Sequence, residues 1–134
     1  MGSTFYRGCE TCILVFDLTS RDSFNNLGDW KKEFLNSLNP PDADTYPFIL
    51  FGNKSDLKDD IKVMDEEIEE FCKVNNNMPY FSTSAKDDSN LEEGFKKAAE
   101  LAFNRYSKNE VTIVPPEIKL LKITKEEPKR CCLK

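Results

Sequence analysis

Two short polar segments carry residue types that could recognise a ligand. Asn53-Lys54-Ser55-Asp56 follows an apolar run at 48–51, and Thr83-Ser84-Ala85-Lys86 follows another at 78–81. The carboxylate of Asp56 can accept two parallel hydrogen bonds from adjacent N–H groups of a planar ligand. Guanine offers such a pair on its ring and exocyclic nitrogens, whereas adenine does not, so the first segment favours a guanine base.

The other groups of the two segments suit the same use. Asn53 is fitted to tie the segments together, and the aliphatic stem of Lys54 can lie across a ring. A backbone N–H near Ala85, between Ser84 and Lys86, can donate to a carbonyl oxygen such as that of guanine. Taken alone, Asn and Asp are ordinary turn residues, and Ser-Ala-Lys is a common tripeptide. The two segments together, about 30 residues apart and each after an apolar run, predict a base-binding site.

Alternating strand and helix patterns predict the elements that position these segments. Apolar runs at 12–16, 48–51 and 78–81 are typical of buried parallel strands. A helical spacing of apolar residues follows each run, from 20 to 38, from 65 to 72 and from 89 to 106. We therefore predict an α/β fold with three parallel strands and three main helices, with both polar segments at carboxyl ends of neighbouring strands.

Local signals refine these boundaries. Thr19 and Ser20 can cap the first helix, and Gly52 is expected to break the second strand. Asp65 can cap the second helix, and the capping-box spacing at 89–92 predicts the start of the third. The inward positions expected on that last helix are Leu91, Phe95, Ala98 and Ala102.

The charge of the chain divides it into two parts. Residues 1–106 hold 12 basic and 20 acidic side chains, a net charge of −8, whereas residues 107–134 hold seven and four, a net charge of +3. We predict a globular part over 1–106 and a flexible basic tail over 107–134. A body this acidic is poorly suited to nucleic acid, so no such partner is expected. The basic tail favours an anionic membrane surface.

The composition also argues against several classes of function. The chain has no histidine, and thus lacks the commonest metal ligand and the commonest acid–base group near neutral pH. An odd number of cysteines and no pattern of a secretory signal argue against a disulfide scaffold. Cys9 and Cys12 have C-x-x-C spacing, but they lead into a strand, which favours structural thiols over a redox pair.

The two polar segments together resemble the two guanine-specificity motifs of Ras-superfamily GTPases. Phe5-Tyr6-Arg7-Gly8, Leu14-Val15-Phe16-Asp17 and Trp30-Lys31-Lys32-Glu33-Phe34 indicate the Rab branch, and segments 47–54 and 79–81 resemble the late-endosomal Rabs most closely. The resemblance covers residues 3–106. It implies that GTP or GDP is the ligand, with Mg²⁺ in the full-length family domain. The residues that it places around the base are Asn53, Lys54, Asp56, Ser84, Ala85 and Lys86.

Two other elements of that family are not found in the sequence. It contains no Gly-Lys step of the phosphate-binding pattern G-x-x-x-x-G-K-[ST], and no glycine has Asp three residues before it. Phosphoryl transfer depends on positioning and charge stabilisation by those groups and Mg²⁺. By resemblance the chain is the later part of a P-loop GTPase fold that lacks the first three strands and the switch regions. We expect it not to hydrolyse GTP by itself.

We expect the first strand to be the element most affected by such a partial fold. By resemblance it is a central strand of the intact sheet, and here it becomes an edge. Residues 13–16 carry no Lys or Pro to protect that edge. An unprotected apolar edge predicts aggregation or pairing with another chain.

The end of the chain carries its own signal. Cys131 and Cys132 follow a basic segment, and two adjacent cysteines suit double prenylation, which anchors a protein durably. The resemblance implies an escort and prenylation machinery, trafficking effectors and a membrane as partners. It places the protein in the cytosol and on the cytoplasmic face of late-endosomal or lysosomal membranes.

Three functions are therefore compared. The first is a truncated Rab-type GTP-binding protein whose parent regulates vesicle traffic to late endosomes or lysosomes. The alternative is a non-catalytic protein-interaction module, membrane-anchored or free, that binds no nucleotide. The third and weakest is a redox protein that uses Cys9 and Cys12.

Overall fold

Three parallel strands form one sheet in the order β1-β2-β3 in the computed structural model, which describes residues 6–110. The strands are β1 (Cys12–Asp17), β2 (Phe48–Asn53) and β3 (Tyr80–Ser82). The helices are α1 (Arg21–Asn25), α2 (Leu27–Leu38), α3 (Asp65–Val74) and α4 (Leu91–Glu110), with short 3₁₀ turns η2 (Ala43–Thr45) and η3 (Lys58–Asp60). The expected α/β fold with three parallel strands is confirmed.

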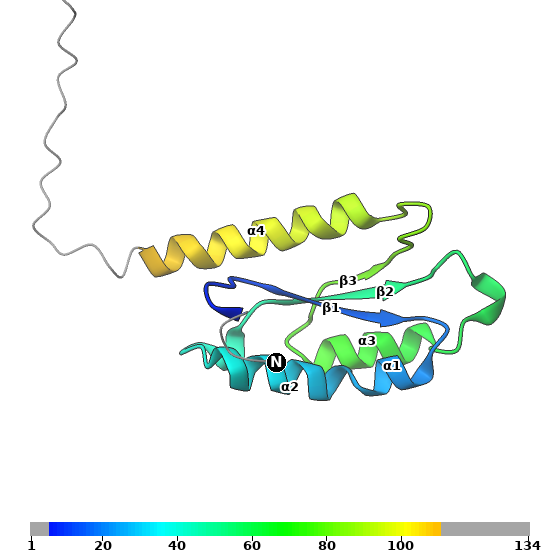
Figure 1. The fold of residues 1–134 in the computed structure, drawn as a ribbon, viewed down its shortest axis with the longest axis horizontal. Helices are drawn as coiled ribbons and strands as arrows, with labels where there is room; N and C mark the ends of the chain where they lie inside the picture. Colours follow the sequence, from blue (N-terminus) through cyan, green and yellow to red (C-terminus); the bar gives the residue numbers. More distant parts are fainter. Residues whose placement is uncertain (1–5, 111–134) are drawn as a thin grey trace, which may run out of the picture.

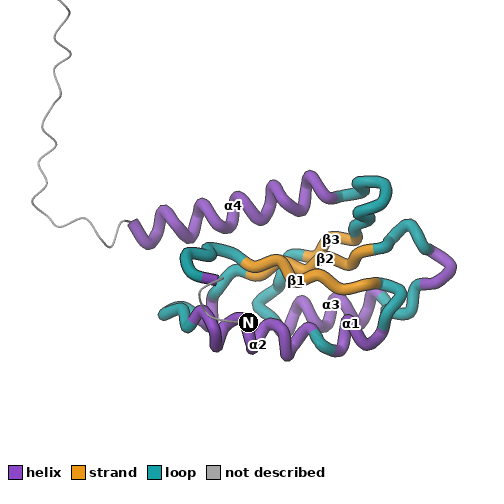
Figure 2. Tube along the Cα trace, viewed as in Figure 1, coloured by secondary structure: helices purple, strands orange, loops and turns teal. Residues whose placement is uncertain are grey.

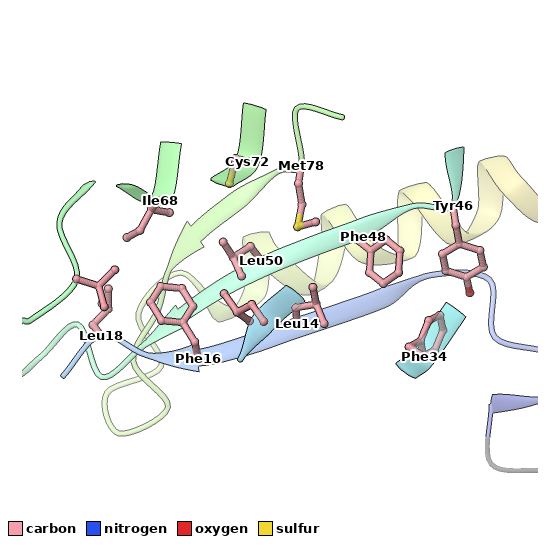
Figure 3. Packing of buried hydrophobic residues seen from close by; sticks show 12 residues of the cluster. Leu14, Phe16, Leu18, Phe34, Tyr46, Phe48, Leu50, Ile68, Cys72 and Met78 are labelled. Atoms are coloured by element: carbon pink, nitrogen blue, oxygen red, sulfur yellow. The ribbon is translucent and has the colours of Figure 1, made fainter. Parts of the chain in front are cut away.

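Helices cover both faces of the sheet. α4 lies on one face, and α1, α2 and α3 lie on the other (Figure 1). Successive residues of a strand point to opposite faces, so β2 contributes Phe48 and Leu50 to the larger core under the three helices (Figure 3). Ile49 and Phe51 of the same strand pack towards α4. Within residues 6–110, no helix combines the length and apolarity needed to cross a membrane.

The first helical segment is divided, where one helix was expected. Asn26 separates α1 from α2, yet its N–H donates to the carbonyl of Asp22 at 3.1 Å and its own carbonyl accepts from Trp30 at 3.0 Å. The interruption is therefore one residue wide. Ser20 stands before α1, but its side chain makes no capping bond. The hydroxyl of Ser23 instead donates to the Ser20 carbonyl at 2.7 Å.

Two predicted boundaries are wrong by a short distance. β2 continues through Gly52 to Asn53, because Gly52 stays in register with both neighbouring strands. The glycine is needed for close packing, since a Cβ there would lie 2.8 Å from the hydroxyl of Tyr80. The helix α3 begins with Asp65 as its first helical residue, and Met64 occupies the capping position.

The helix α4 differs from its predicted face. Ala98 is buried and packs with Phe51 as expected, but the ring of Phe95 is mostly exposed. The hydroxyl of Ser89 donates to Asp87 at 2.6 Å instead of capping the helix. α4 continues to Glu110, past the boundary at 106 predicted for the globular part. The division into a body and a tail stays a prediction.

Gly94 brings α4 close to the sheet, and its substitution tests this packing. A Cβ at Gly94 would overlap the buried ring of Phe51. We expect Gly94→Ala to lower the free energy of unfolding by about 1–3 kcal/mol, the usual cost of overpacking. Gly28→Ala in α2 is the matched control, because no atom lies within 4 Å of its Cβ. Gly28→Ala should raise the free energy of unfolding by up to about 1 kcal/mol through its higher helix propensity. Urea unfolding of both measures the difference, and equal shifts would contradict the contact.

Candidate functional site

The two polar segments meet at the carboxyl end of the sheet. Gly52 of β2 is in register with Ser82 of β3, so both strands end side by side (Figure 2). The N–H of Thr83 donates to the carbonyl of Gly52 at 2.8 Å, and the N–H of Ser55 donates to the carbonyl of Thr83 at 3.0 Å. The expectation that parallel pairing brings these loops together is confirmed.

Asn53 joins the two loops through its side chain. Its Oδ1 accepts the backbone N–H of Ala85 at 3.0 Å, the tying role expected for this residue. The same bond occupies the N–H that was expected to recognise a ligand carbonyl. The N–H of Lys86 is less committed, since it donates to the hydroxyl of Ser84 at a longer 3.3 Å. A ligand carbonyl would therefore share the first N–H or take the second.

Asp56 is held in place by the opposite loop. Its Oδ1 accepts the hydroxyl of Ser84 at 2.8 Å, and its Oδ2 lies 3.6 Å from the ammonium of Lys86. Ser84 is fully buried, whereas the Lys86 side chain is largely exposed. An ionised carboxylate offers about four acceptor positions. Asp56 therefore keeps acceptor capacity towards a ligand while its orientation is fixed.

Lys54 is fixed by a residue that sequence reasoning missed. Its backbone has φ of 67°, and its Nζ lies 2.6 Å from Oδ2 of Asp17 at the end of β1. Partial burial raises the pKa of Asp17, but bonds from Lys54 and Thr19 outweigh this and hold the pKa below its usual 3.8. The parallel register of β1 and β2 places Asp17 opposite Asn53, and the sequence carries no signal for this contact.

The two loops line an open cavity of about 510 Å³. Of the six predicted residues, five line it and Ser84 lies buried beneath Asp56. The lining also includes Leu57, an apolar residue next to the first segment that sequence reasoning did not select. The full lining is Asn53, Lys54, Asp56, Leu57, Ala85 and Lys86. A volume of this order suits a small planar ligand with apolar contact to its faces and polar groups at its edge.

The remaining predicted sites are the two pairs of cysteines. Burial, with a further contribution from nearby Cys9, raises the pKa of Cys12 to about 12. Such a thiol is a poor nucleophile near neutral pH, so the redox hypothesis loses its support. Cys131 and Cys132 lie outside the described residues. Over 6–110, no group of three or more potential ligands among His, Cys, Asp and Glu is placed to hold a metal ion.

Comparison with known proteins agrees with this arrangement. A family model described as the Ras family matches residues 1–104. Ras-related protein Rab-7b of Paramecium octaurelia is 36% identical over 138 residues, which cover 98% of this chain and 65% of that protein. Rab7 of Drosophila melanogaster is 40% identical over 111 residues, 83% of this chain and 53% of that protein. Rab-9B of Mus musculus is 47% identical over 94 residues, with shares of 70% and 46%. The chain thus spans about half to two thirds of the length of these relatives.

Proposed function

We propose, from the premise that the chain belongs to the Ras family and has Rab7-type relatives, that it is a Rab-type guanine nucleotide-binding protein. The base is held in the cavity between the loops after β2 and β3. The observation that carries this proposal is the placement of Asp56, an oriented carboxylate at the edge of a cavity with partly apolar walls. Its two oxygens would accept the ring N–H and the amino group of guanine.

The remaining groups of the cavity fit the rest of the base. The stem of Lys54 is held by the bond of its ammonium to Asp17, and it can cover one face of the ring. Leu57 supplies apolar contact from the same loop. The backbone N–H groups of Ala85 and Lys86 donate to Asn53 and Ser84 in the structure. Sharing either of these bonds would supply a donor to the guanine carbonyl, which adenine does not have.

The affinity is expected to be low, because the sequence has no pattern for binding the phosphates. A hydrogen bond to a charged group contributes about 1.5–3 kcal/mol, and ordering the ligand costs several kcal/mol. We therefore expect a dissociation constant on the order of 1 mM or weaker, where 1 mM corresponds to about −4 kcal/mol. Titration with a fluorescent GDP analogue should not saturate at micromolar ligand. Tight, Mg²⁺-dependent binding would contradict this account of the phosphates.

Exchange of the carboxylate for an amide tests the base directly. In Asp56→Asn the amide oxygen can still accept the Ser84 hydroxyl, but an N–H replaces the second acceptor. We expect guanosine monophosphate to lose its effect on the amide chemical shifts of Ala85 and Lys86 at millimolar ligand. Xanthosine monophosphate has a carbonyl in place of the amino group, and it should change the amide chemical shifts of Ala85 and Lys86 in the variant but not in the parent chain.

The matched control for this exchange is Asp29→Asn on the exposed surface of α2. It should respond to guanosine monophosphate like the parent chain, and neither protein should respond to adenosine monophosphate. Equal responses to guanine and adenine nucleotides in the parent would refute recognition of the base at this cavity.

We further infer the cellular role from the Rab-type relatives. The protein would act in vesicle traffic at late-endosomal or lysosomal membranes, with trafficking effectors as partners, and lipids on Cys131 and Cys132 would anchor it. Localisation of the tagged full chain, with and without both cysteines, tests this role. Equal membrane association of the two forms would contradict lipid anchoring.

A further inference from the structure

The strand β1 presents an unpaired backbone edge. Within residues 6–110 it pairs only with β2. The N–H of Cys12 donates to the carbonyl of Pro47, and the N–H of Leu18 donates to that of Asn53, at 3.2 and 3.0 Å. Alternate residues of a strand direct their backbone groups to the same side. The even-numbered residues of β1 therefore face β2, and the odd-numbered residues face outwards.

The free hydrogen-bonding groups on this edge belong to two residues. Asp17, at the end of β1, has both groups bonded: its N–H donates to the hydroxyl of Ser23 at 3.0 Å, and its carbonyl accepts the N–H of Ser20 at 2.9 Å. Ile13 and Val15 have no such partner on the outer side within the part of the chain that the structure describes. The edge therefore offers two N–H donors and two carbonyl acceptors in a row.

The surface beside this edge is apolar and uncharged. The side chain of Val15 is 58% exposed on the side of α4, and Trp30 on α2 is equally exposed on the other side of the sheet. Between them, a cavity of about 330 Å³ runs along β1, with Tyr6 in its wall. No residue from Cys12 to Phe16 is charged or is proline. The usual devices that keep an edge strand from pairing are therefore missing.

We propose that β1 pairs with β1 of a second copy of this chain, antiparallel, about a two-fold axis at Leu14. This axis places Ile13 opposite Val15 of the second copy, and Val15 opposite its Ile13. Each N–H then faces a carbonyl, so the partial charges of the two edges are complementary at all four positions. The four free groups of each chain are satisfied, and a six-stranded sheet with β3 at both ends results.

No other antiparallel alignment of these edges satisfies all four groups. An axis at Val15 would place Ile13 opposite Asp17, whose N–H and carbonyl are already bonded to Ser23 and Ser20. An axis at Ile13 would place Val15 opposite Thr11, which lies outside β1. The pattern of free groups therefore specifies a closed pair rather than an open-ended stack of chains.

The side chains and the net charge lead to two further expectations for the dimer. On the α4 side, Val15 would pack against Ile13 of the second copy, an apolar cross-strand pair. The net charge of −5 on each chain opposes association, so moderate salt should strengthen the dimer by screening. The base-binding cavity lies on the loops after β2 and β3, outside this interface. The dimer can therefore be tested without nucleotide.

Analytical ultracentrifugation of the full chain at rising concentration tests the proposal. We expect a monomer–dimer equilibrium that Val15→Lys weakens at least about tenfold, because a charge then lies in the apolar interface. Val74→Lys on α3 is the matched control, since Val74 is also largely exposed but lies away from β1. It should dimerise like the parent chain. A chain that stays monomeric up to roughly 1 mM would overturn the proposal.

Two further measurements test the dimer without relying on Val15→Lys. Val15→Pro removes one outward N–H and leaves the bonds to β2 intact, and it should weaken the dimer as well. Hydrogen exchange of the Ile13 and Val15 amides in the unmodified chain should slow as concentration rises. Protection that does not depend on concentration would show that a segment of the same chain, within 1–5 or 111–134, covers the edge. Species larger than dimers would show unspecific pairing, and either result would refute the two-fold arrangement.

Discussion

Phe34→Ala is expected to lower the free energy of unfolding by about 3–5 kcal/mol, the usual cost of truncating a buried phenylalanine. Phe34 is almost fully buried on α2. Its ring packs at steep angles against three other rings, with centroids at 5.0 Å from Tyr6, 5.4 Å from Tyr46 and 5.6 Å from Phe48. The substitution therefore removes one side of the aromatic cluster that attaches α2 to β2 (Figure 3).

This loss is large relative to the total stability of the chain. Domains of this size unfold with about 5–15 kcal/mol, so the variant should lose a large share of its free energy of unfolding. Urea unfolding followed by near-ultraviolet circular dichroism measures the change. Phe103→Ala is the matched control, because the ring of Phe103 is 69% exposed on α4. It should change the free energy of unfolding by at most about 0.5 kcal/mol. Similar losses in both variants would show that the cluster does not hold α2.

The order of elements was predictable from the sequence because each strand is a short apolar run. Alternation of such runs with helical spacing leaves few topologies open, and parallel pairing follows. The errors lie where tertiary contacts override local patterns. Gly52 lies inside β2 because the approach of Tyr80 needs a residue without Cβ. Phe95 touches Phe51 only through one side of its ring, with the ring centroids 5.6 Å apart, and stays 56% exposed, while Gly94 lies directly against the Phe51 ring.

The candidate site was predicted in its main residues for a similar reason. Asn53, Asp56 and Ala85 belong to two loops that parallel neighbours must bring together. Asp17 could not be selected, because its role depends on the register of β1 against β2 and not on a motif. Leu57 was missed because an apolar residue in a polar loop has no pattern of its own.

The cluster around Arg105 was not predicted, because its partners are far apart in the sequence. Arg105 lies in α4 with a side chain only 13% exposed. Its Nε and Nη2 donate to the carboxylate of Asp42 at 3.0 and 2.8 Å, and Nη1 donates to Glu10 and, at 3.4 Å, to the carbonyl of Cys9. The guanidinium also stacks 4.5 Å from the ring centre of Tyr46. One residue thus connects α4 to the segments that precede β1 and β2.

Arg105→Met is therefore expected to lower the free energy of unfolding by about 2–3 kcal/mol at neutral pH. Loss of one partner from a fully buried ion pair costs about 3–5 kcal/mol. The carboxylates of Asp42 and Glu10 are about one third exposed, so water can partly replace the guanidinium and reduce the cost. Arg21→Met is the matched control. Arg21 also forms a two-bond pair, with Glu67, but both side chains are largely exposed and the change should be small.

The pH dependence of the free energy of unfolding distinguishes the contribution of charge from that of packing around Arg105. Hydrogen bonds from Arg105 hold the pKa of Asp42 below its usual 3.8, although partial burial raises it. A carboxyl group with a lowered pKa in the folded state stabilises the protein above its usual pKa, and this contribution is lost as pH falls through the folded value. The difference between the parent chain and Arg105→Met should therefore be greatest near neutral pH and shrink as the pH falls below about 4. Urea midpoints over that range measure it. A difference that stays constant with pH would mean that Arg105 stabilises the fold by packing on Tyr46 rather than through the carboxylates.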